Sequence, residues 1–421
     1  MELKKYRLGD IAKVEISGID KKSKEGQQDV LLCNFVDVYY NWAVTKDNES
    51  KFMPATASDS EIESFTLHKG QVAITKDSET RDDIGVATYI ADDFDNLVVL
   101  GYHTALITPD EEQLCGKYLN ALMHSSYFQR YWSNNASGSG QRYTLSQKVI
   151  EDAPVYLPDI DIQREIGEFF SDLDRKLCLN KKENEILEAM AKQIYDYWFI
   201  QFDFPDANGR PYKTSGGKMV WNETLKREIP EGWEVKNLPY IASFTNGLAC
   251  QRFRPTGDDC GLPVIKISNM HGEKSNEKEF VKSDIPESVK VYDGDILFSW
   301  SASLEVIIWA YGIGGLNQHI FKVTEKNGYS KYFVYHKLLG YVDQFRRIAQ
   351  ARKTTMGHIT SDHLNQSTIE IPDNEIIYKS FDKEVAPIYS RIISNSQEVI
   401  KLQGLKDFIL PLLMTGQVTI E

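Results

Sequence analysis

Two polar loops of this chain carry side chains that can hydrogen-bond to nucleic-acid bases or phosphates. The first reads GSGQRY over residues 138–143, and the second reads RKTTMGH over residues 352–358. Arginine can pair bidentately with guanine, and glutamine can pair with adenine. The candidate DNA-contacting residues of the two loops are Gln141, Arg142, Tyr143, Arg352, Lys353, Thr354, Thr355 and His358.

Two further segments follow similar strand-like runs. Residues 76–81 (KDSETR) come after KGQVAIT, and residues 299–303 (SWSAS) come after DGDILF. They add Lys76, Arg81 and Ser301 to the candidates. Arg252 and Arg254 are cations that could reach phosphates. For any one of these residues, an ordinary solvated side chain is the alternative interpretation. The hypothesis depends on the equivalent placement of these segments in the two halves of the chain.

A search for catalytic motifs finds no local signature. The sequence lacks a P-loop, a Rossmann glycine fingerprint, an HExxH metal motif and a GxSxG elbow. The five cysteines form no CxxC pair, and His103, His319 and His358 are scattered, which favours structural roles for them. We therefore predict no catalytic residue, no metal site and no cofactor in this chain.

The elements that must position these loops are two long amphipathic stretches. Residues 159–198 carry apolar side chains at steps of three and four, which is typical of a long helix. Residues 373–412 repeat the pattern with a constant shift of 215, so that Ile166 matches Phe381 and Ile194 matches Ile409. Pro387 predicts a kink or a late start of the second helix, and Pro411 predicts its end. Internal repetition on this scale indicates a duplicated architecture.

An asparagine interrupts the apolar stripe at the same place in both helices, as Asn180 and Asn395. A buried asparagine in a helical seam fixes the register at some cost in stability. If the helices pack antiparallel, their middles meet. We therefore expect Asn180 and Asn395 to face each other and to hydrogen-bond, with exposure of both to solvent as the alternative.

The remaining segments form two short-stranded heads. Strands are expected within residues 69–75, 84–90, 97–108 and 153–158, and helices near residues 113–132 and 331–349. The predicted organisation is a mixed α/β domain at 1–158, a spacer helix at 159–200, a connector at 201–232, a second domain at 233–372, and a second spacer helix with a C-terminal tail at 373–421. The expected fold class is α+β, with two mixed domains, two long antiparallel coiled-coil-like helices and an internal pseudo-two-fold repeat.

Composition sets outer limits on these interpretations. The 421 residues carry a formal charge of −13, with 42% hydrophobic and 26% charged residues, as in an ordinary globular protein. An acidic chain does not wrap nucleic acid unaided, so other subunits would supply part of any phosphate contact. No apolar run is long enough to span a bilayer, which predicts a cytoplasmic protein without membrane contact.

The two-fold repeat of head and helix, the TTMGHIT and IEIP segments before the second helix, and the linker FPDANGRPYKTSGGKMVWN with REIPEGWEV resemble one family. It is the specificity subunit of Type I restriction–modification systems. The resemblance covers essentially the whole chain. It implies two target-recognition domains that each read half of a split double-stranded DNA sequence, with the helices as spacer. The first loop, GSGQRYTLS, departs from the TTMGHIT form.

The same resemblance implies the partners. They are two methyltransferase subunits and ATP-driven restriction subunits, which would bind S-adenosylmethionine, ATP and magnesium in place of this chain. The chain itself would be a non-catalytic recognition subunit in phage defence. One alternative is an adaptor that binds only proteins through its helices. Another is a methyltransferase or nuclease that acts alone, which the missing cofactor motifs disfavour.

Overall fold

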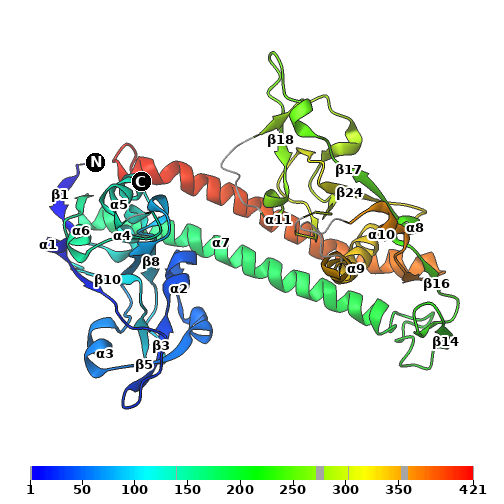
Figure 1. The fold of residues 1–421 in the computed structure, drawn as a ribbon, viewed down its shortest axis with the longest axis horizontal. Helices are drawn as coiled ribbons and strands as arrows, with labels where there is room; N and C mark the ends of the chain where they lie inside the picture. Colours follow the sequence, from blue (N-terminus) through cyan, green and yellow to red (C-terminus); the bar gives the residue numbers. More distant parts are fainter. Residues whose placement is uncertain (1, 139, 272–278, 302, 352–358, 421) are drawn as a thin grey trace. The chain divides into compact units, whose positions relative to one another are not determined.

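The computed structural model of this chain describes residues 2–138, 140–271, 279–301, 303–351 and 359–420. The chain divides into two compact units, Met1–Cys178 with Leu402–Glu421, and Leu179–Lys401. Each unit contains a head of short strands and portions of the same two long helices, α7 (Ile160–Tyr195) and α11 (Glu375–Met414) (Figure 1).

The first unit is built on a five-stranded sheet in the order β2-β10-β6-β8-β4. Three smaller sheets, β5-β3-β9, β1-β13 and β11-β12-β7, surround it. The strands are β1 (Lys4–Arg7), β2 (Ala12–Ile16), β3 (Gln28–Cys33), β4 (Ala43–Val44), β5 (Met53–Ala57), β6 (Val72–Thr75), β7 (Asp77–Ser78), β8 (Ala87–Ile90), β9 (Val98–Leu100), β10 (Thr104–Pro109), β11 (Ser137–Gly138), β12 (Tyr143–Thr144) and β13 (Pro154–Leu157). The short helices are α1 (Leu8–Ile11), α2 (Phe35–Tyr40), α3 (Asp59–Phe65), α4 (Gly116–Met123), α5 (Ser126–Asn135) and α6 (Gln147–Glu151).

The second unit has a four-stranded sheet in the order β17-β24-β21-β22 and a second one in the order β19-β18-β23-β20. Its strands are β14 (Met219–Asn222), β15 (Arg227–Pro230), β16 (Glu234–Lys236), β17 (Ala242–Asn246), β18 (Leu262–Ile265), β19 (Phe280–Val281), β20 (Lys290–Val291), β21 (Ile296–Ser299), β22 (Glu305–Ile308), β23 (Gly314–Leu316), β24 (Ile320–Glu325) and β25 (Ile369–Ile371). Its further helices are α8 (Leu238–Ile241), a π-helix at Asp196–Ile200, α9 (Lys331–Ala351) and α10 (Ser361–Asn365).

The two heads repeat one plan. The strand order β2-β10-β6-β8 of the first head corresponds to β17-β24-β21-β22 of the second, and all of these neighbours pair antiparallel. The antiparallel pair β1–β13 likewise corresponds to β16–β25. The predicted internal repeat is therefore confirmed at the level of strand topology.

Within each unit, α7 and α11 pack side by side and run antiparallel. In the first unit, Leu410 and Leu413 of α11 join the core that holds Ile166 and Phe170 of α7. In the second unit, Glu183 of α7 pairs with Arg391 of α11, whereas Phe199, further along the chain, packs against Phe381, earlier in α11. Residue numbers rise along one helix as they fall along the other, as the sequence predicted.

For the second helix, the predicted late start and the predicted end at Pro411 were wrong. Helix α11 is continuous through both Pro387 and Pro411. Both prolines lie on its exposed side. There, water can hydrogen-bond to the carbonyl groups that lose their helical partner. The helix ends at Met414, where Gly416 adopts a positive φ of 72° and its N–H donates to the Leu413 carbonyl, a common helix ending.

One other expectation needs revision. The helix predicted at residues 113–132 is divided into α4 and α5, because Ser125 adopts an extended conformation and its side chain caps the second helix by accepting from Phe128 N. The polar connector is an ordered segment. It folds as the β14–β15 hairpin, and Phe202 and Phe204 pack on Trp233 with ring centroids 5.3 and 5.4 Å apart.

Candidate DNA-reading site

In the first head, two of the predicted segments come together in one small sheet. Strand β7 pairs with β12, so that Ser78 lies opposite Tyr143 and Asp77 lies opposite Thr144. The Leu145 N–H donates to the Lys76 carbonyl at 2.7 Å. The segments 76–81 and 141–143, which are more than sixty residues apart in sequence, therefore form a single site.

A close main-chain approach supports this sheet. Gly138 pairs with Tyr143 in the β11–β12 ladder at a positive φ of 146°. A Cβ atom at Gly138 would lie 2.1 Å from the Arg142 carbonyl oxygen, which is shorter than any real contact. Glycine is therefore required at this position for the strand pair that presents Arg142. The small residues that the sequence suggested were a flexible loop belong partly to a hairpin.

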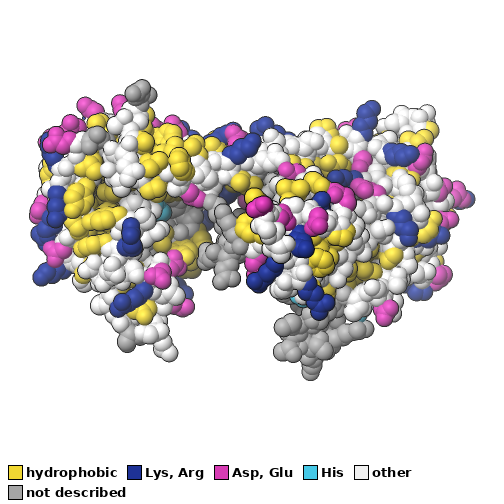
Figure 2. All heavy atoms as spheres, turned by 90° about the horizontal axis from the view of Figure 1, so that it is seen from above, with side chains coloured by type: hydrophobic (Ala, Val, Ile, Leu, Met, Phe, Trp, Pro, Cys, Tyr) yellow, Lys and Arg dark blue, Asp and Glu magenta, His cyan; other side chains and the backbone are white. Residues whose placement is uncertain are grey.

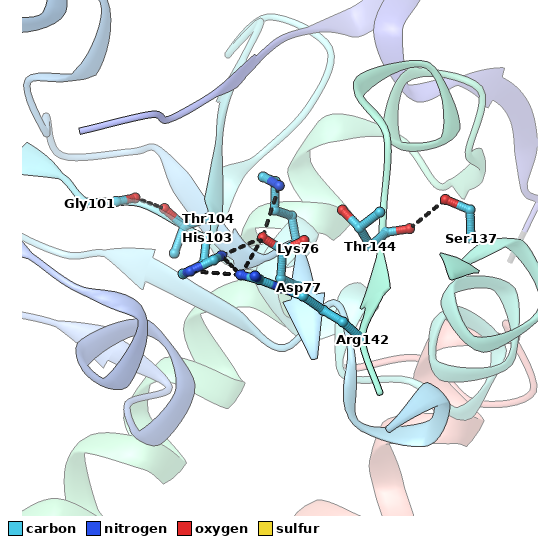
Figure 3. A network of polar contacts seen from close by, with 8 residues as sticks. All are labelled: Lys76, Asp77, Gly101, His103, Thr104, Ser137, Arg142 and Thr144. Carbon is cyan, nitrogen blue, oxygen red and sulfur yellow. Dashed lines mark hydrogen bonds and ion pairs between the residues drawn. The ribbon is translucent and has the colours of Figure 1, made fainter. Parts of the chain in front are cut away.

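Asp77 is the centre of a polar network that the sequence did not suggest (Figure 3). Its carboxylate Oδ2 lies 2.9 Å from Lys76 Nζ, 2.5 Å from His103 Nδ1 and 3.9 Å from Arg142 Nη2. Burial raises the pKa of Asp77, but hydrogen bonds from Thr144, His103 and Lys76 outweigh burial and hold the pKa below its usual value. Asp77 is therefore a buried, ionised carboxylate that organises the cations around it.

Arg142 comes directly before β12, and its side chain extends to the same network. Its Nη2 lies 2.7 Å from His103 Nδ1 and 2.8 Å from His103 Nε2, while 59% of the side chain remains exposed. Arg81 lies over the ring of Tyr143, with its guanidinium carbon 5.2 Å from the ring centroid. Gln141 is exposed beside them. Lys76, Arg81, Arg142 and Tyr143 thus share one surface.

The sequence analysis missed Asp77 and classified His103 as structural. His103 lies in the turn before β10 with a positive φ of 71°, and its ring centroid is 3.6 Å from that of the exposed Tyr102. A signal was present in the chain, because Tyr102–His103 and Gln318–His319 occupy matching places in the two heads.

The second head has the same main-chain frame around a different set of side chains. The Trp300 N–H donates to the His319 carbonyl, as the Lys76 N–H donates to the His103 carbonyl. The Ile359 N–H donates to the Trp300 carbonyl, as the Leu145 N–H donates to the Lys76 carbonyl. Trp300 therefore takes the place of Lys76.

Aromatic and neutral polar groups replace the charged network in the second head. The Trp300 indole donates to Asn246 Oδ1 at 3.1 Å, and its ring lies 5.5 Å from that of His319. Ser301, a predicted contact residue, follows Trp300 and is buried. The predicted residues Arg352, Lys353, Thr354, Thr355 and His358 lie outside the described residues.

Arg252 and Arg254 occupy a separate exposed segment of the second head. Arg252 ends a short 3₁₀ turn that begins at Cys250. In the part of the chain that the structure describes, neither arginine contacts Trp300 or His319 through a hydrogen bond, an ion pair or a ring contact. Their role as phosphate contacts remains a prediction.

The helix seam is polar, but its pairing differs from the expectation. Asn180 and Asn395 are both buried, each with 1% of its surface exposed. Asn180 Nδ2 donates to Glu398 Oε2 at 2.8 Å, whereas Asn395 Nδ2 donates to Asn184 Oδ1 at 3.0 Å. Asn395 Oδ1 has no hydrogen-bond partner among the described residues, so the predicted direct bond between Asn180 and Asn395 was wrong. The two asparagines are offset along the seam, and each donates its amide to a polar side chain about one turn away from the other asparagine.

Two searches of the described residues gave no further site. Among them, no group of three or more His, Cys, Asp or Glu side chains is placed to hold a metal ion. No helix in the described ranges combines the length and the apolar character that crossing a bilayer requires. On the face drawn in Figure 2, Lys and Arg side chains are interspersed with Asp and Glu. Selectivity on this face would depend on individual side chains.

Comparison with known proteins gives matches in one family. Residues 1–189 match the model of the Type I restriction modification DNA specificity domain. The HindI specificity subunit of Haemophilus influenzae is 24% identical over 99% of both chains. The MjaIX specificity subunit of Methanocaldococcus jannaschii is 24% identical over 74% of this chain and 71% of its own length.

A solved structure has the same overall fold. The Type I restriction–modification S subunit from M. genitalium superimposes with a TM-score of 0.60 at 12% identity, over 98% of this chain and 96% of that chain. The family model and the curated relatives confirm the sequence resemblance, and the solved structure shows that the two-headed fold is shared. Over its whole length the chain is similar to specificity subunits of Type I restriction–modification systems.

Proposed function

We propose that this chain reads a two-part sequence in double-stranded DNA, with one part read by each head. The observation that supports this proposal is the common main-chain frame with unlike side chains, Lys76 and Asp77 in the first head and Trp300 and Ser301 in the second. Two copies of one frame with different chemistry suit two different half-sequences. As a DNA specificity subunit, the chain contributes recognition and is not itself an enzyme.

The domain boundaries are part of the same proposal. Residues 1–158 and 233–372 are the two reading domains, and residues 201–232 connect the first spacer helix to the second domain. Residues 159–200 and 373–421 carry the helices that set the distance between the two DNA segments. A helix pair keeps a fixed length because each residue adds about 1.5 Å, whereas a flexible linker would blur the spacing.

Methyltransferase subunits are the proposed occupants of an exposed apolar surface that occurs on both helices. Of the apolar residues near the helix ends, Tyr195, Trp198 and Phe199 are buried in the second unit's core, so they are not available for docking. Met190 and Leu405 occupy equivalent positions of the repeat, 215 residues apart, and are 47% and 40% exposed. A repeated exposed patch fits two copies of one partner.

This docking proposal is tested by the double substitution Met190→Asp and Leu405→Asp. The variant should no longer copurify with the methyltransferase subunit, because a carboxylate in an apolar interface must lose its hydration. Ile376→Asp is the matched control, since Ile376 is also an exposed aliphatic residue of α11 but lies outside the repeated patch. Equal copurification of both variants would contradict the assignment.

The chemistry on the DNA is assigned to the partner subunits. Methyltransferase subunits would bind S-adenosylmethionine and modify adenine, and ATP-dependent restriction subunits would bind ATP and magnesium. No cofactor is assigned to this chain.

Co-expression with the methyltransferase subunits tests the function as a whole. Mapping of methylated adenines across the host genome should give one asymmetric motif of two specified segments with an unspecified gap. If the chain were an adaptor that binds only proteins, the mapping would show no sequence-dependent pattern of adenine methylation. Methylation by the purified single chain would instead contradict the non-catalytic role.

A further inference from the structure

The guanidinium of Arg142 is held in place but keeps most of its donors for a ligand. A guanidinium has five N–H donors arranged as two forks that share Nη2. His103 engages only Nη2, and in the described part of the chain neither Nε nor Nη1 of Arg142 has a hydrogen-bond partner. One N–H of Nη2 donates to His103. The other N–H of Nη2 and a neighbouring N–H of the guanidinium can therefore still donate as a pair to a ligand on the exposed side of the residue.

The groups behind Arg142 fix its orientation. The Asp77 carboxylate lies 2.5 Å from His103 Nδ1, so the proton of the neutral imidazole belongs on Nδ1, where it is donated to Asp77. Arg142 Nη2 lies 2.7 Å from Nδ1 and 2.8 Å from Nε2, and with this tautomer only Nε2 can accept a hydrogen bond from it. Asp77 is largely buried and also holds Lys76, and the Thr144 side chain donates to it. The guanidinium plane is thus fixed by a chain of partners that ends inside the head.

A fixed fork suits the edge of a base better than a phosphate. Lysine serves as well as arginine where only charge is needed, whereas the rigid planar fork of a guanidinium matches guanine N7 and O6 with two parallel bonds better than a flexible ammonium does. Arg81, stacked on Tyr143 beside the site, supplies a second cation for the backbone. The second head has Trp300 and Ser301 where the first has Lys76 and Asp77, so the position that corresponds to Asp77 carries no carboxylate.

We infer that Arg142 reads a guanine in the DNA segment bound by the first head, and that Asp77 and His103 are positioning residues for Arg142. This inference rests on the proposed function. It specifies one G·C pair in one of the two segments and assigns no such contact to the described residues of the second head.

The decisive variant is Arg142→Lys, examined with the co-expressed methyltransferase subunits by mapping of methylated adenines. The preference for guanine at one position of one segment should fall roughly ten- to a hundredfold, the range for a bidentate base contact. The other positions and the other segment should be unchanged. Arg130→Lys is the matched control, because Arg130 is an exposed arginine of α5 in the same head, away from the network, and it should leave the motif intact.

Asp77→Asn tests the positioning role. It preserves the size of the side chain but removes the charge that orients His103 and Arg142. Preference should relax at the same base pair as in Arg142→Lys, whereas a merely structural role would lower methylation at all sequences without changing base preference. Because Arg142 is on the surface, Arg142→Lys keeps the inference testable even if Asp77→Asn folds poorly.

The outcomes separate the inference from the function that it assumes. A wild-type chain that directs no two-part motif would overturn the proposed function. A wild-type motif that Arg142→Lys leaves unaltered in base preference, with only a uniform loss of methylation, would show a phosphate contact and overturn the inference. So would relaxation at a position other than a G·C pair.

Discussion

The buried ion pair between Lys337 and Glu370 should stabilise the second unit only while both partners are present. Lys337 Nζ lies 2.7 Å from Glu370 Oε1, and the two side chains are 3% and 7% exposed. Arg227 of the connector pairs with the other carboxylate oxygen at 2.7 Å. Burial raises the pKa of Glu370, but Lys337 and Arg227 outweigh burial and hold it below its usual value. Burial lowers the pKa of Lys337, and Glu370 opposes that shift. Because the ammonium lies against an ionised carboxylate, we treat both groups as charged in the fold.

Removal of one partner leaves the other charge buried. Breaking such a pair typically costs about 3–5 kcal/mol. Arg227 still pairs with Glu370 in Lys337→Met, and a charge-assisted hydrogen bond contributes about 1.5–3 kcal/mol. We therefore expect Lys337→Met to lower the free energy of unfolding by about 2–3 kcal/mol. The double substitution Lys337→Met with Glu370→Met removes both buried charges and leaves Arg227, whose side chain is 40% exposed and can be hydrated. This variant should remain within roughly 1 kcal/mol of the wild type.

Hydrogen exchange of α9 and β25 amides in increasing urea measures this free energy for the second unit separately. Lys379→Met is the matched control, because Lys379 forms an exposed pair with Glu375 and its loss should change stability little. Equal losses in the single and double variants would refute the reasoning. They would mean that Lys337 acts through its aromatic neighbours, such as Phe333, whose ring centroid is 5.5 Å from Nζ.

Three further predictions follow from the helices and the core. Burial lowers the pKa of His336 to about 3, so the unfolded chain takes up this proton first as the pH falls below about 6.5, and the second unit should lose roughly 2 kcal/mol of stability between pH 8 and pH 5. Urea titrations at the two pH values would show this, and His336→Gln should reduce the difference. Asn395→Leu should lower the free energy of unfolding by roughly 1–3 kcal/mol, because it leaves the Asn184 carbonyl without its donor; an unchanged urea midpoint would contradict this role of the seam. Insertion of four residues into both α7 and α11 should lengthen the gap of the DNA motif by about two base pairs, and methylation mapping that returned the original gap would exclude the helices as the spacer.

The repeat in the sequence was sufficient to predict the fold class. A constant shift over eight positions, seven apolar and one asparagine, predicted two equivalent helices, and the two helices run antiparallel within each unit. The shift could not predict which polar groups pair across the seam. Asn180 bonds to Glu398 and Asn395 to Asn184, since the exact meeting point depends on side-chain packing that the pattern does not contain.

Local rules failed where burial decides the outcome. Pro387 and Pro411 are tolerated because they point toward solvent, and a sequence window does not specify that side. The candidate arginines were found by residue type, but the groups that orient Arg142 were not. Asp77 and His103 belong to different strands, and only the pairing of β6 with β10 brings them together.

The shared frame of the two heads has an evolutionary consequence. Hydrogen bonds between main-chain atoms hold residues 76 and 300 in place, and these bonds are formed whatever side chain the residue carries. A new side chain at either position can therefore be introduced while the main-chain conformation stays the same. When viruses lose the recognised sequence, a few codon changes can give such a protein a new DNA sequence specificity. The change can occur in one head while the other head keeps its own specificity.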